Sequence, residues 1–168
     1  MSKPFVAVLM GSDSDLPTMQ ATLDVLKKLE IPCEVRITSA HRTPAATHDY
    51  VTDAEARGCS VFIAAAGLAA HLAGAVSAIT VRPVIGVPLD AGPLQGMDAL
   101  LSTVMMPGGI PVACVAVGKA GAKNAAYLAA QIMAVGDSGL ADRLRQERQS
   151  NAAAIQEKNA ALQASLTS

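Results

Sequence analysis

The stretch FVAVLMGSDSD, residues 5–15, joins a continuous apolar run to a polar turn that starts at Gly11. A run that is apolar at every position is typical of a strand covered on both faces of a parallel sheet. Residues 16–30 then place Leu and Met side chains at helical spacing, and Pro17 suits the first turn of a helix. The stretch therefore predicts the strand, turn and helix with which an α/β fold begins.

The same alternation of apolar runs and helical patterns continues along the chain. Further strands are expected at 33–38, 61–66, 84–87 and 112–117. Helices are expected at 44–57, 67–79, 96–104, 122–135 and, longer and more polar, 138–164. Such alternation implies parallel strands joined by right-handed crossovers. The prediction is one flavodoxin-like domain, residues 1–168, with a five-stranded parallel sheet in a three-layer αβα arrangement and a long C-terminal helix.

The apolar fraction of the chain is large but consists of small residues. Hydrophobic residues make up 51% of the sequence and aromatic residues 2%, whereas 33 of the 168 residues are alanine. This composition excludes a disordered chain, which would combine low hydrophobicity with high net charge. It also argues against recognition of single-stranded nucleic acid, which relies on stacking against aromatic rings.

Charge and cysteine content indicate a soluble cytoplasmic protein. The formal net charge is −1, so the sequence has no basic footprint for nucleic acid or an anionic membrane. Uninterrupted apolar runs fall short of the ~20 residues of a membrane span, and the N-terminus lacks the pattern of a signal peptide. The three cysteines form no CxxC pair, which predicts free, structural thiols in apolar surroundings.

In a doubly wound sheet, ligands bind at the carboxyl ends of the strands, beside the topological switch point. This rule selects the loops that follow the five expected strands as candidates for the site. They are Gly11–Asp15, Ser39–Thr43, Gly67–Gly74, Pro88–Gly96 and Gly118–Gly121.

The first of these loops combines serine hydroxyls, free backbone N–H groups and the start of a helix, which together suit an anion. It lacks the lysine and the second glycine of a P-loop, and its two carboxylates would repel a polyphosphate. Asp15 has two interpretations, which can coexist on one loop. It is a plain helix N-cap, or it accepts hydrogen bonds from sugar hydroxyls.

The second loop carries a base and a cation side by side. Arg42 can pair its guanidinium group with a phosphate or a carboxylate, and His41 titrates near neutral pH and can move a proton. Thr43 is expected to cap the next helix, with Pro44 at its first position. His48 falls within that helix and is interpreted as a surface or packing residue.

The third loop, Gly67–Gly74, is rich in small residues. They either let a ligand approach the backbone or let a helix pack closely on the sheet. His71 accordingly fits a pocket or the core equally well. The three histidines lack metal-ligand spacing and no acidic cluster accompanies them, so no metal site is expected.

Taken together, five motifs resemble those of one enzyme family. They are VLMGSDSD (8–15), SAHRTP (39–44), AGLAAHL (66–72), MPGGIPV (106–112) and KNAA (123–126). Over almost the whole chain the sequence is similar to the bacterial class I N5-carboxyaminoimidazole ribonucleotide mutases of purine biosynthesis. The resemblance implies isomerisation of N5-carboxyaminoimidazole ribonucleotide to 4-carboxy-5-aminoimidazole ribonucleotide, with neither a metal nor an organic cofactor.

The resemblance also implies roles for individual residues. His41 would carry the proton while CO2 leaves the carbamate and is recaptured at C4 of the imidazole. The ribonucleotide would contact Ser12, Asp15, Arg42 and Ser39. The loop residues that would hold the carboxylate and enclose CO2 are Ala70, His71 and Leu72.

The family further implies a homo-octamer in which the C-terminal helix, about 138–164, reaches a neighbouring subunit. It also implies a functional link to the ATP-dependent enzyme that makes the carbamate. The chain departs from the family pattern at Leu68, where Gly is common, and at Ala73, where Pro is common. Asp90–Pro93 replaces a stretch that usually contains Gln and Ser. These departures affect the expected shape of the pocket wall.

Two other functions compete with the mutase reading. Related class II enzymes carboxylate aminoimidazole ribonucleotide directly with CO2, but they typically replace Arg42 with Lys and the Ala-Ala-His loop with a Ser-Asn-containing sequence. The present chain follows the mutase pattern at both places. A flavin-binding electron-transfer domain on the same fold is a more remote alternative, because none of the four aromatic residues falls in a candidate site loop.

Overall fold

Strands and helices alternate along the chain in the computed structural model, which describes residues 3–166. The strands are β1 Phe5–Met10, β2 Cys33–Ile37, β3 Cys59–Ala66, β4 Val84–Pro88 and β5 Ala113–Cys114. The helices are α1 Leu16–Lys28, α2 Pro44–Ala56, α3 Leu72–Ser77, α4 Met97–Val104, α5 Gly118–Ala134 and α6 Ser138–Leu166. A short 3-10 turn, η1 Asp13–Asp15, leads from β1 into α1.

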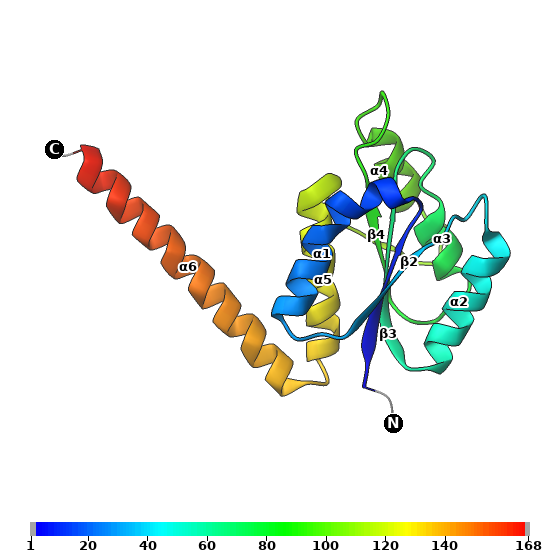
Figure 1. Cartoon of the computed structure of the whole chain (residues 1–168), viewed down its shortest axis with the longest axis horizontal. Coiled ribbons are helices and arrows are strands. Elements are labelled where there is room, and N and C mark those ends of the chain that lie inside the picture. Colours follow the sequence, from blue (N-terminus) through cyan, green and yellow to red (C-terminus); the bar gives the residue numbers. More distant parts are fainter. Residues whose placement is uncertain (1–2, 167–168) are drawn as a thin grey trace.

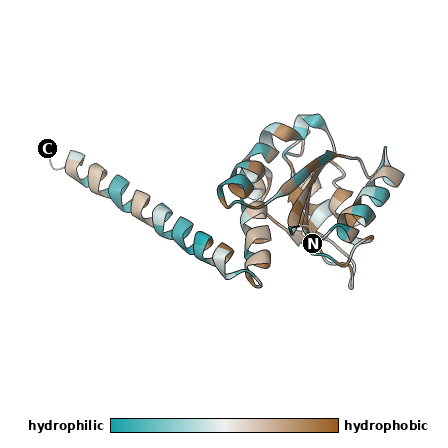
Figure 2. Ribbon diagram, turned by 60° about the horizontal axis from the view of Figure 1, so that its bottom comes forward, coloured by the Kyte–Doolittle hydropathy of each residue, from teal (hydrophilic) through white to brown (hydrophobic). Residues whose placement is uncertain are grey.

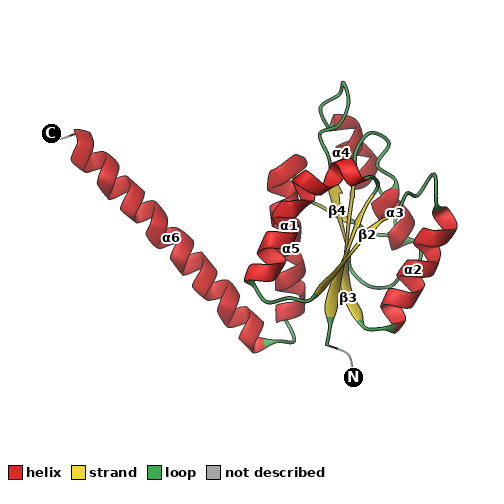
Figure 3. Ribbon diagram, in the orientation of Figure 1, coloured by secondary structure: helices red, strands yellow, loops and turns green. Residues whose placement is uncertain are grey.

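The strands form one sheet, drawn in yellow in Figure 3. All neighbouring strands are parallel, and their order is β2-β1-β3-β4-β5. The chain adds β2 on one side of β1 and then returns to add β3 on the other side. The flavodoxin-like, five-stranded prediction is therefore confirmed, and the topological switch point lies between β1 and β3.

Helices cover both faces of the sheet, with α1 and α5 on one side and α2 and α3 on the other (Figure 1). In β1, the even-numbered residues from Val6 to Met10 pack toward α1 and α5, and the odd-numbered residues from Phe5 to Leu9 pack toward α2 and α3. Every residue of this strand is buried. Burial on both faces explains why the run is apolar at each position rather than alternating.

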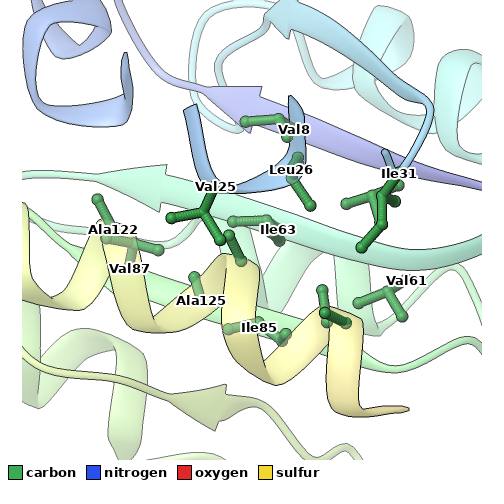
Figure 4. Packing of buried hydrophobic residues seen from close by; sticks show 14 of the residues in the cluster. Val8, Val25, Leu26, Ile31, Val61, Ile63, Ile85, Val87, Ala122 and Ala125 are labelled. Carbon is green, nitrogen blue, oxygen red and sulfur yellow. The ribbon is translucent and has the colours of Figure 1, made fainter. Parts of the chain in front are cut away.

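Helix α5 packs on α1 and the sheet through alanines. Figure 4 shows Ala122 and Ala125 among strand side chains that include Ile85 and Val87. The hydroxyl of Thr22 on α1 donates a 2.7 Å hydrogen bond to the carbonyl of Ala122, so the two backbones lie close together. The buried alanines, each fully inaccessible to solvent, are Ala122, Ala125, Ala126, Ala129 and Ala130. The shortage of bulky side chains therefore reflects close helix packing rather than a weak core.

The two edge strands differ from expectation. Strand β5 is shorter than the predicted 112–117, because it pairs only with Ile85 and Gly86 and the chain then turns into α5 at Gly118, whose φ is +71°. On the opposite edge, β2 leaves Ile37 60% exposed. The expectation of cysteines in apolar surroundings is wrong for Cys33, which is exposed on β2, whereas Cys59 is buried and Cys114 is partly buried. Hydropathy marks these segments as strands but does not show that they lie at the edges.

Helix α6 begins where the sequence predicts and projects away from the sheet (Figure 1). Its first turns pack through Leu140, Leu144 and Glu147, whereas residues 148–166 are exposed. Figure 2 shows that this projecting part is largely hydrophilic, with apolar residues at intervals.

Glu147 anchors α6 to the body of the protein. Its carboxylate lies 2.5 Å from Lys28 Nζ on α1 and accepts a 2.9 Å hydrogen bond from the Tyr127 hydroxyl on α5. The hydrogen bond from Lys28 is the main reason that the pKa of Glu147 lies below its ordinary value. The contact therefore stabilises the charged carboxylate.

The alanine packing predicts the effect of a larger side chain on α5. Ala125→Leu adds volume where no space exists, and we expect it to lower the free energy of unfolding by about 1–3 kcal/mol. Ala120→Leu, on the exposed side of the same helix, is the matched control and should change stability little. Urea unfolding measures both. Equal stability of the two variants would contradict the close approach of α5 to the sheet.

The Glu147 contact that anchors α6 predicts that the stability of the protein depends on pH. The pKa of Glu147 is depressed in the folded protein. Its contribution to the free energy of unfolding is therefore present above the ordinary glutamate pKa of about 4.3, and it is lost as pH falls through the lower pKa of the folded state. Glu147→Gln should therefore lower the unfolding free energy by about 1–2 kcal/mol at pH 7. The difference from the original chain should shrink toward pH 3. A difference that stays constant with pH would show that the charge contributes nothing.

Candidate active site

A cavity of about 400 Å³ opens at the carboxyl ends of β1, β2 and β3. The loops after these three strands form most of its lining, and Ala91 in the loop after β4 adds to it. The loop Gly118–Gly121, also a candidate from the sequence, contributes nothing to the lining because it forms the first turn of α5. The cavity therefore lies at the switch point that the strand order defines.

The loop after β1 is held by a reciprocal pair of hydrogen bonds. The Ser14 N–H donates to Ser12 Oγ at 3.3 Å, and the Ser12 N–H donates to Asp15 Oδ2 at 3.0 Å. This capping box belongs to η1, and α1 itself has no side-chain cap. Asp15 is thus a capping residue of the preceding turn rather than the N-cap side chain of α1. Partial burial raises its pKa, against the opposing effect of the Ser12 N–H.

The loop after β2 folds into a tight turn that reaches across to the β1 loop. The Ser39 N–H donates to Thr43 Oγ1 at 2.9 Å, and the Arg42 N–H donates to Ser39 Oγ at 3.2 Å. Arg42 Nη2 donates to the carbonyl of Gly11 at 3.0 Å, which brings the guanidinium group to the cavity beside Ser12. Thr43 stands at the predicted N-cap position, but its hydroxyl bonds Ser39 rather than the N–H groups of α2.

Two histidines from different loops meet in the cavity. His41 Nε2 lies 2.8 Å from His71 Nδ1, and the rings are edge-on, with centroids 4.9 Å apart and planes at 78°. A neutral imidazole has one donor and one acceptor nitrogen, so this hydrogen bond holds one shared proton between the rings. His71 therefore lies in the pocket and not in the core, the two positions that the sequence left open. His48 lies exposed on α2, as predicted.

The predicted site residues come together with one exception. Ala70 is 2% exposed and does not line the cavity, because its small side chain is buried while its neighbours Ala69 and His71 face the space. The predicted residues that do line the cavity are Ser12, Asp15, Ser39, His41, Arg42, His71 and Leu72.

One wall of the cavity is formed where two of the candidate loops, Gly67–Gly74 and Pro88–Gly96, meet. A Cβ on Gly67 would lie 2.7 Å from Ala91 Cβ, and a Cβ on Gly92 would lie 2.5 Å from Leu68 Cδ2. The loops after β3 and β4 therefore interlock, each placing a side chain over a glycine of the other. Leu68 and Asp90–Pro93, both departures from the family pattern, are thus in contact. The sequence placed both loops at the site and indicated that the wall departs from the family pattern, but it did not predict the contact between them.

Other kinds of site receive no support from the described part of the chain. Among residues 3–166, no group of three or more His, Cys, Asp or Glu residues is arranged to hold a metal ion. Over the same residues, every helix is too short or too polar to cross a membrane.

Comparison with known proteins gives one consistent result. Residues 5–154 match the AIR carboxylase family. The chain is 51% identical to the N5-carboxyaminoimidazole ribonucleotide mutase of Synechocystis, over 95% of this chain and 90% of that protein. It is 48% identical to the enzyme of the same name from Bacillus subtilis, over 94% and 97%. A crystal structure of Treponema denticola PurE superposes with a TM-score of 0.86 at 33% identity, over 95% and 99%.

The interlocked wall predicts that two substitutions compensate each other. Gly67→Ala should lower the unfolding free energy by about 1–3 kcal/mol, because its Cβ would clash with Ala91. Ala91→Gly removes the clashing atom and should restore most of that loss in the double variant, although Ala91→Gly alone is neutral or slightly destabilising. A double-mutant cycle from urea unfolding measures the coupling. Strictly additive effects would contradict the contact.

Proposed function

The chain belongs to the AIR carboxylase family, and from this premise we propose how its cavity performs the reaction. The protein is an isomerase that converts N5-carboxyaminoimidazole ribonucleotide to 4-carboxy-5-aminoimidazole ribonucleotide in purine biosynthesis. The observation that carries the mechanism is the His41–His71 hydrogen bond inside a cavity that Arg42 also lines.

The ribonucleotide is bound by its phosphate and ribose at the polar side of the cavity. Arg42 supplies a positive charge and a planar set of donors, and the hydroxyls of Ser12 and Ser39 lie in the same lining. The carboxylate of Asp15 accepts hydrogen bonds from the ribose hydroxyls. The substrate carboxylate lies against the backbone of residues 69–72, next to the histidine pair.

His41 transfers a proton in both halves of the reaction. Protonated His41 donates its proton to the nitrogen of the carbamate, the bond between that nitrogen and the carboxyl carbon breaks, and CO2 and aminoimidazole ribonucleotide form. C4 of the ribonucleotide then attacks CO2, and neutral His41 accepts the proton that C4 loses. An imidazole can both donate and accept a proton, so one side chain serves first as acid and then as base.

His71 is a positioning residue in this scheme. Its Nδ1 is the hydrogen-bond partner of His41 Nε2, so it orients the His41 ring and fixes which nitrogen faces the substrate. Both rings come from loops at the same edge of the sheet, which brings them within hydrogen-bond distance.

Substitution of His41 tests the mechanism. His41→Asn should keep the fold and the affinity for the ribonucleotide but reduce kcat by about 10²- to 10⁴-fold, as expected for loss of a general acid–base. His48→Asn, on the exposed side of α2, is the matched control and should keep full activity. Steady-state kinetics with the carbamate substrate gives both parameters. Nearly normal turnover in correctly folded His41→Asn protein would refute the role of His41.

Direct carboxylation of aminoimidazole ribonucleotide by CO2 is the nearest alternative. Similarity to the phosphoribosylaminoimidazole carboxylase of Ogataea methanolica supports this alternative. The two proteins are 54% identical over 81% of this chain, which corresponds to only 25% of the longer carboxylase. The two activities are separated by the substrate supplied. Product formed only from ribonucleotide plus CO2, and none from the carbamate, would favour this alternative.

The oligomeric state and the cellular location of the protein are also part of the proposal. We propose a homo-octamer that works in the cytoplasm beside the ATP-dependent enzyme that supplies the labile carbamate. Free cysteines suit a reducing compartment. Apolar side chains exposed in the single chain support assembly. They lie on β2, on and just after α4, and on the projecting part of α6, and include Ile37, Leu101, Met105, Ile155 and Leu162.

Light scattering tests the assembly. The expected mass is about eight times the 17.1 kDa of one chain. If α6 docks on a neighbour, Ile155→Glu should lower that mass, because it places a charge in an apolar contact. Gln156→Glu, at the adjacent exposed position, is the control and should leave the mass unchanged. A single species of 17.1 kDa for the original chain would contradict the octamer.

A further inference from the structure

The turn that carries His41 and Arg42 is closed by a hydroxyl group that takes no part in the chemistry. Thr43 Oγ1 accepts a hydrogen bond from the Ser39 N–H at 2.9 Å and donates one to the Ser39 carbonyl at 3.2 Å. The Thr43 N–H also donates to that carbonyl, at 2.9 Å. Thr43 thus binds both backbone polar groups of Ser39, and the three residues between them form a closed turn.

The position of Thr43 in the sequence favours a different use of its side chain. It stands at the N-cap of α2, where a threonine hydroxyl commonly accepts a hydrogen bond from an N–H group of the first helical turn. In this protein α2 has no side-chain cap, and Pro44 at the start of the helix has no N–H to satisfy. The hydroxyl of Thr43 therefore stabilises the turn before the helix rather than the helix itself.

Two buried threonines hold Thr43 from the side of the sheet. Thr47 Oγ1 donates to the Thr43 carbonyl at 3.1 Å and lies 2.6 Å from Thr38 Oγ1. A hydroxyl has one hydrogen, so Thr47, which gives its hydrogen to Thr43, accepts the hydrogen of Thr38. Thr38 is bound in turn to β1, because its N–H donates to the Met10 carbonyl at 2.9 Å. We call Thr38, Thr43 and Thr47 the threonine clamp.

The threonine clamp lies outside the cavity but controls the segment that enters it. His41 and Arg42 line the cavity, whereas the three threonines do not. Both side chains reach from the turn to a neighbouring loop, His41 to the ring of His71 and Arg42 to the carbonyl of Gly11. His41 and Arg42 are exposed in the single chain, so burial does not hold them. Their positions depend on the backbone of the turn that Thr43 closes.

We propose that Thr43 is a positioning residue for the reaction: its hydroxyl fixes the turn so that His41 faces the reacting atoms and Arg42 faces the phosphate. This inference rests on the proposed mutase function. It assigns no contact with the substrate to Thr43, which acts through its two neighbours in the chain.

Replacing the hydroxyl by a methyl group tests the role. Thr43→Val keeps the branched shape of the side chain and removes both of its hydrogen bonds to Ser39. We expect kcat to fall by about 10- to 100-fold, because a displacement of about 1 Å in a reacting group can cost about 10²-fold in rate. KM for the ribonucleotide should rise several-fold through Arg42. Thr43→Ser restores the hydroxyl and should restore most of kcat.

Thr52→Val is the matched control. Thr52 is also exposed, lies on α2, and donates its hydroxyl to the carbonyl four residues earlier, that of His48, at 2.9 Å. Its variant should keep the kcat of the original chain. Thr43→Val and Thr52→Val should unfold at similar urea concentrations, so that a lower kcat in the first is not a loss of folded protein. Thr43→Ala is a second variant without the hydroxyl and should behave as Thr43→Val does.

A double-mutant cycle separates positioning from a merely structural role. If Thr43 acts through His41, Thr43→Val should lower kcat little in a chain that already carries His41→Asn. An equal fold loss in both backgrounds would refute the proposal. A rise in KM with unchanged kcat would also refute it, because that result indicates direct binding of the ribonucleotide by Thr43.

A crystal structure of Thr43→Val gives a readout that needs no turnover. His41 Nε2 should lie farther from His71 Nδ1 than the 2.8 Å of the original chain, beyond hydrogen-bond distance. If the original chain converts no carbamate, the proposed function itself is wrong. If it converts the carbamate and Thr43→Val keeps both kcat and the contact between the histidines, only the role of Thr43 is refuted.

Discussion

Because β1 lies between β2 and β3 in a parallel sheet, the loops that follow these strands all emerge at one edge and face one another. Every chemical group of the cavity depends on this arrangement. The β1 loop supplies Ser12 and Asp15, the β2 loop supplies His41 and Arg42, and the β3 loop supplies His71. Residues about 30 positions apart in the chain thus come within hydrogen-bond distance, as the 2.8 Å contact between the two histidine rings shows.

The small side chains of the protein allow the close packing that holds these loops and helices in place. Alanines on α5 let this helix lie close to α1 and the sheet, and the hydrogen bond from Thr22 to the Ala122 carbonyl fixes that approach. Glycines at the edge of the cavity let the β3 and β4 loops interlock, since a Cβ at Gly67 or Gly92 would collide with the facing loop. The residues that line the cavity bring hydroxyls, charges, imidazoles and aliphatic groups.

The parts of the fold and site that the sequence predicted well are those that depend on local patterns. Apolar runs and helical spacing located the elements, and the switch-point rule selected the loops that hold His41 and Arg42. Features that depend on distant neighbours were missed or left open. His71 fitted a pocket or the core until the strand order placed it opposite His41, and Thr43 bonds Ser39 rather than capping α2. The contact between Leu68 and Gly92 joins two loops and has no local pattern.

In the proposed mechanism, one cavity holds the ribonucleotide with its imidazole at the histidine pair. A crystal structure with 4-carboxy-5-aminoimidazole ribonucleotide bound tests this most directly. We predict the phosphate on Arg42 and Ser39, and a ring nitrogen of His41 within about 3–3.5 Å of C4, the distance of a reactive contact. Density for the imidazole away from His41, or for the ligand in the hollow lined by Lys119 and Lys123, would contradict the account.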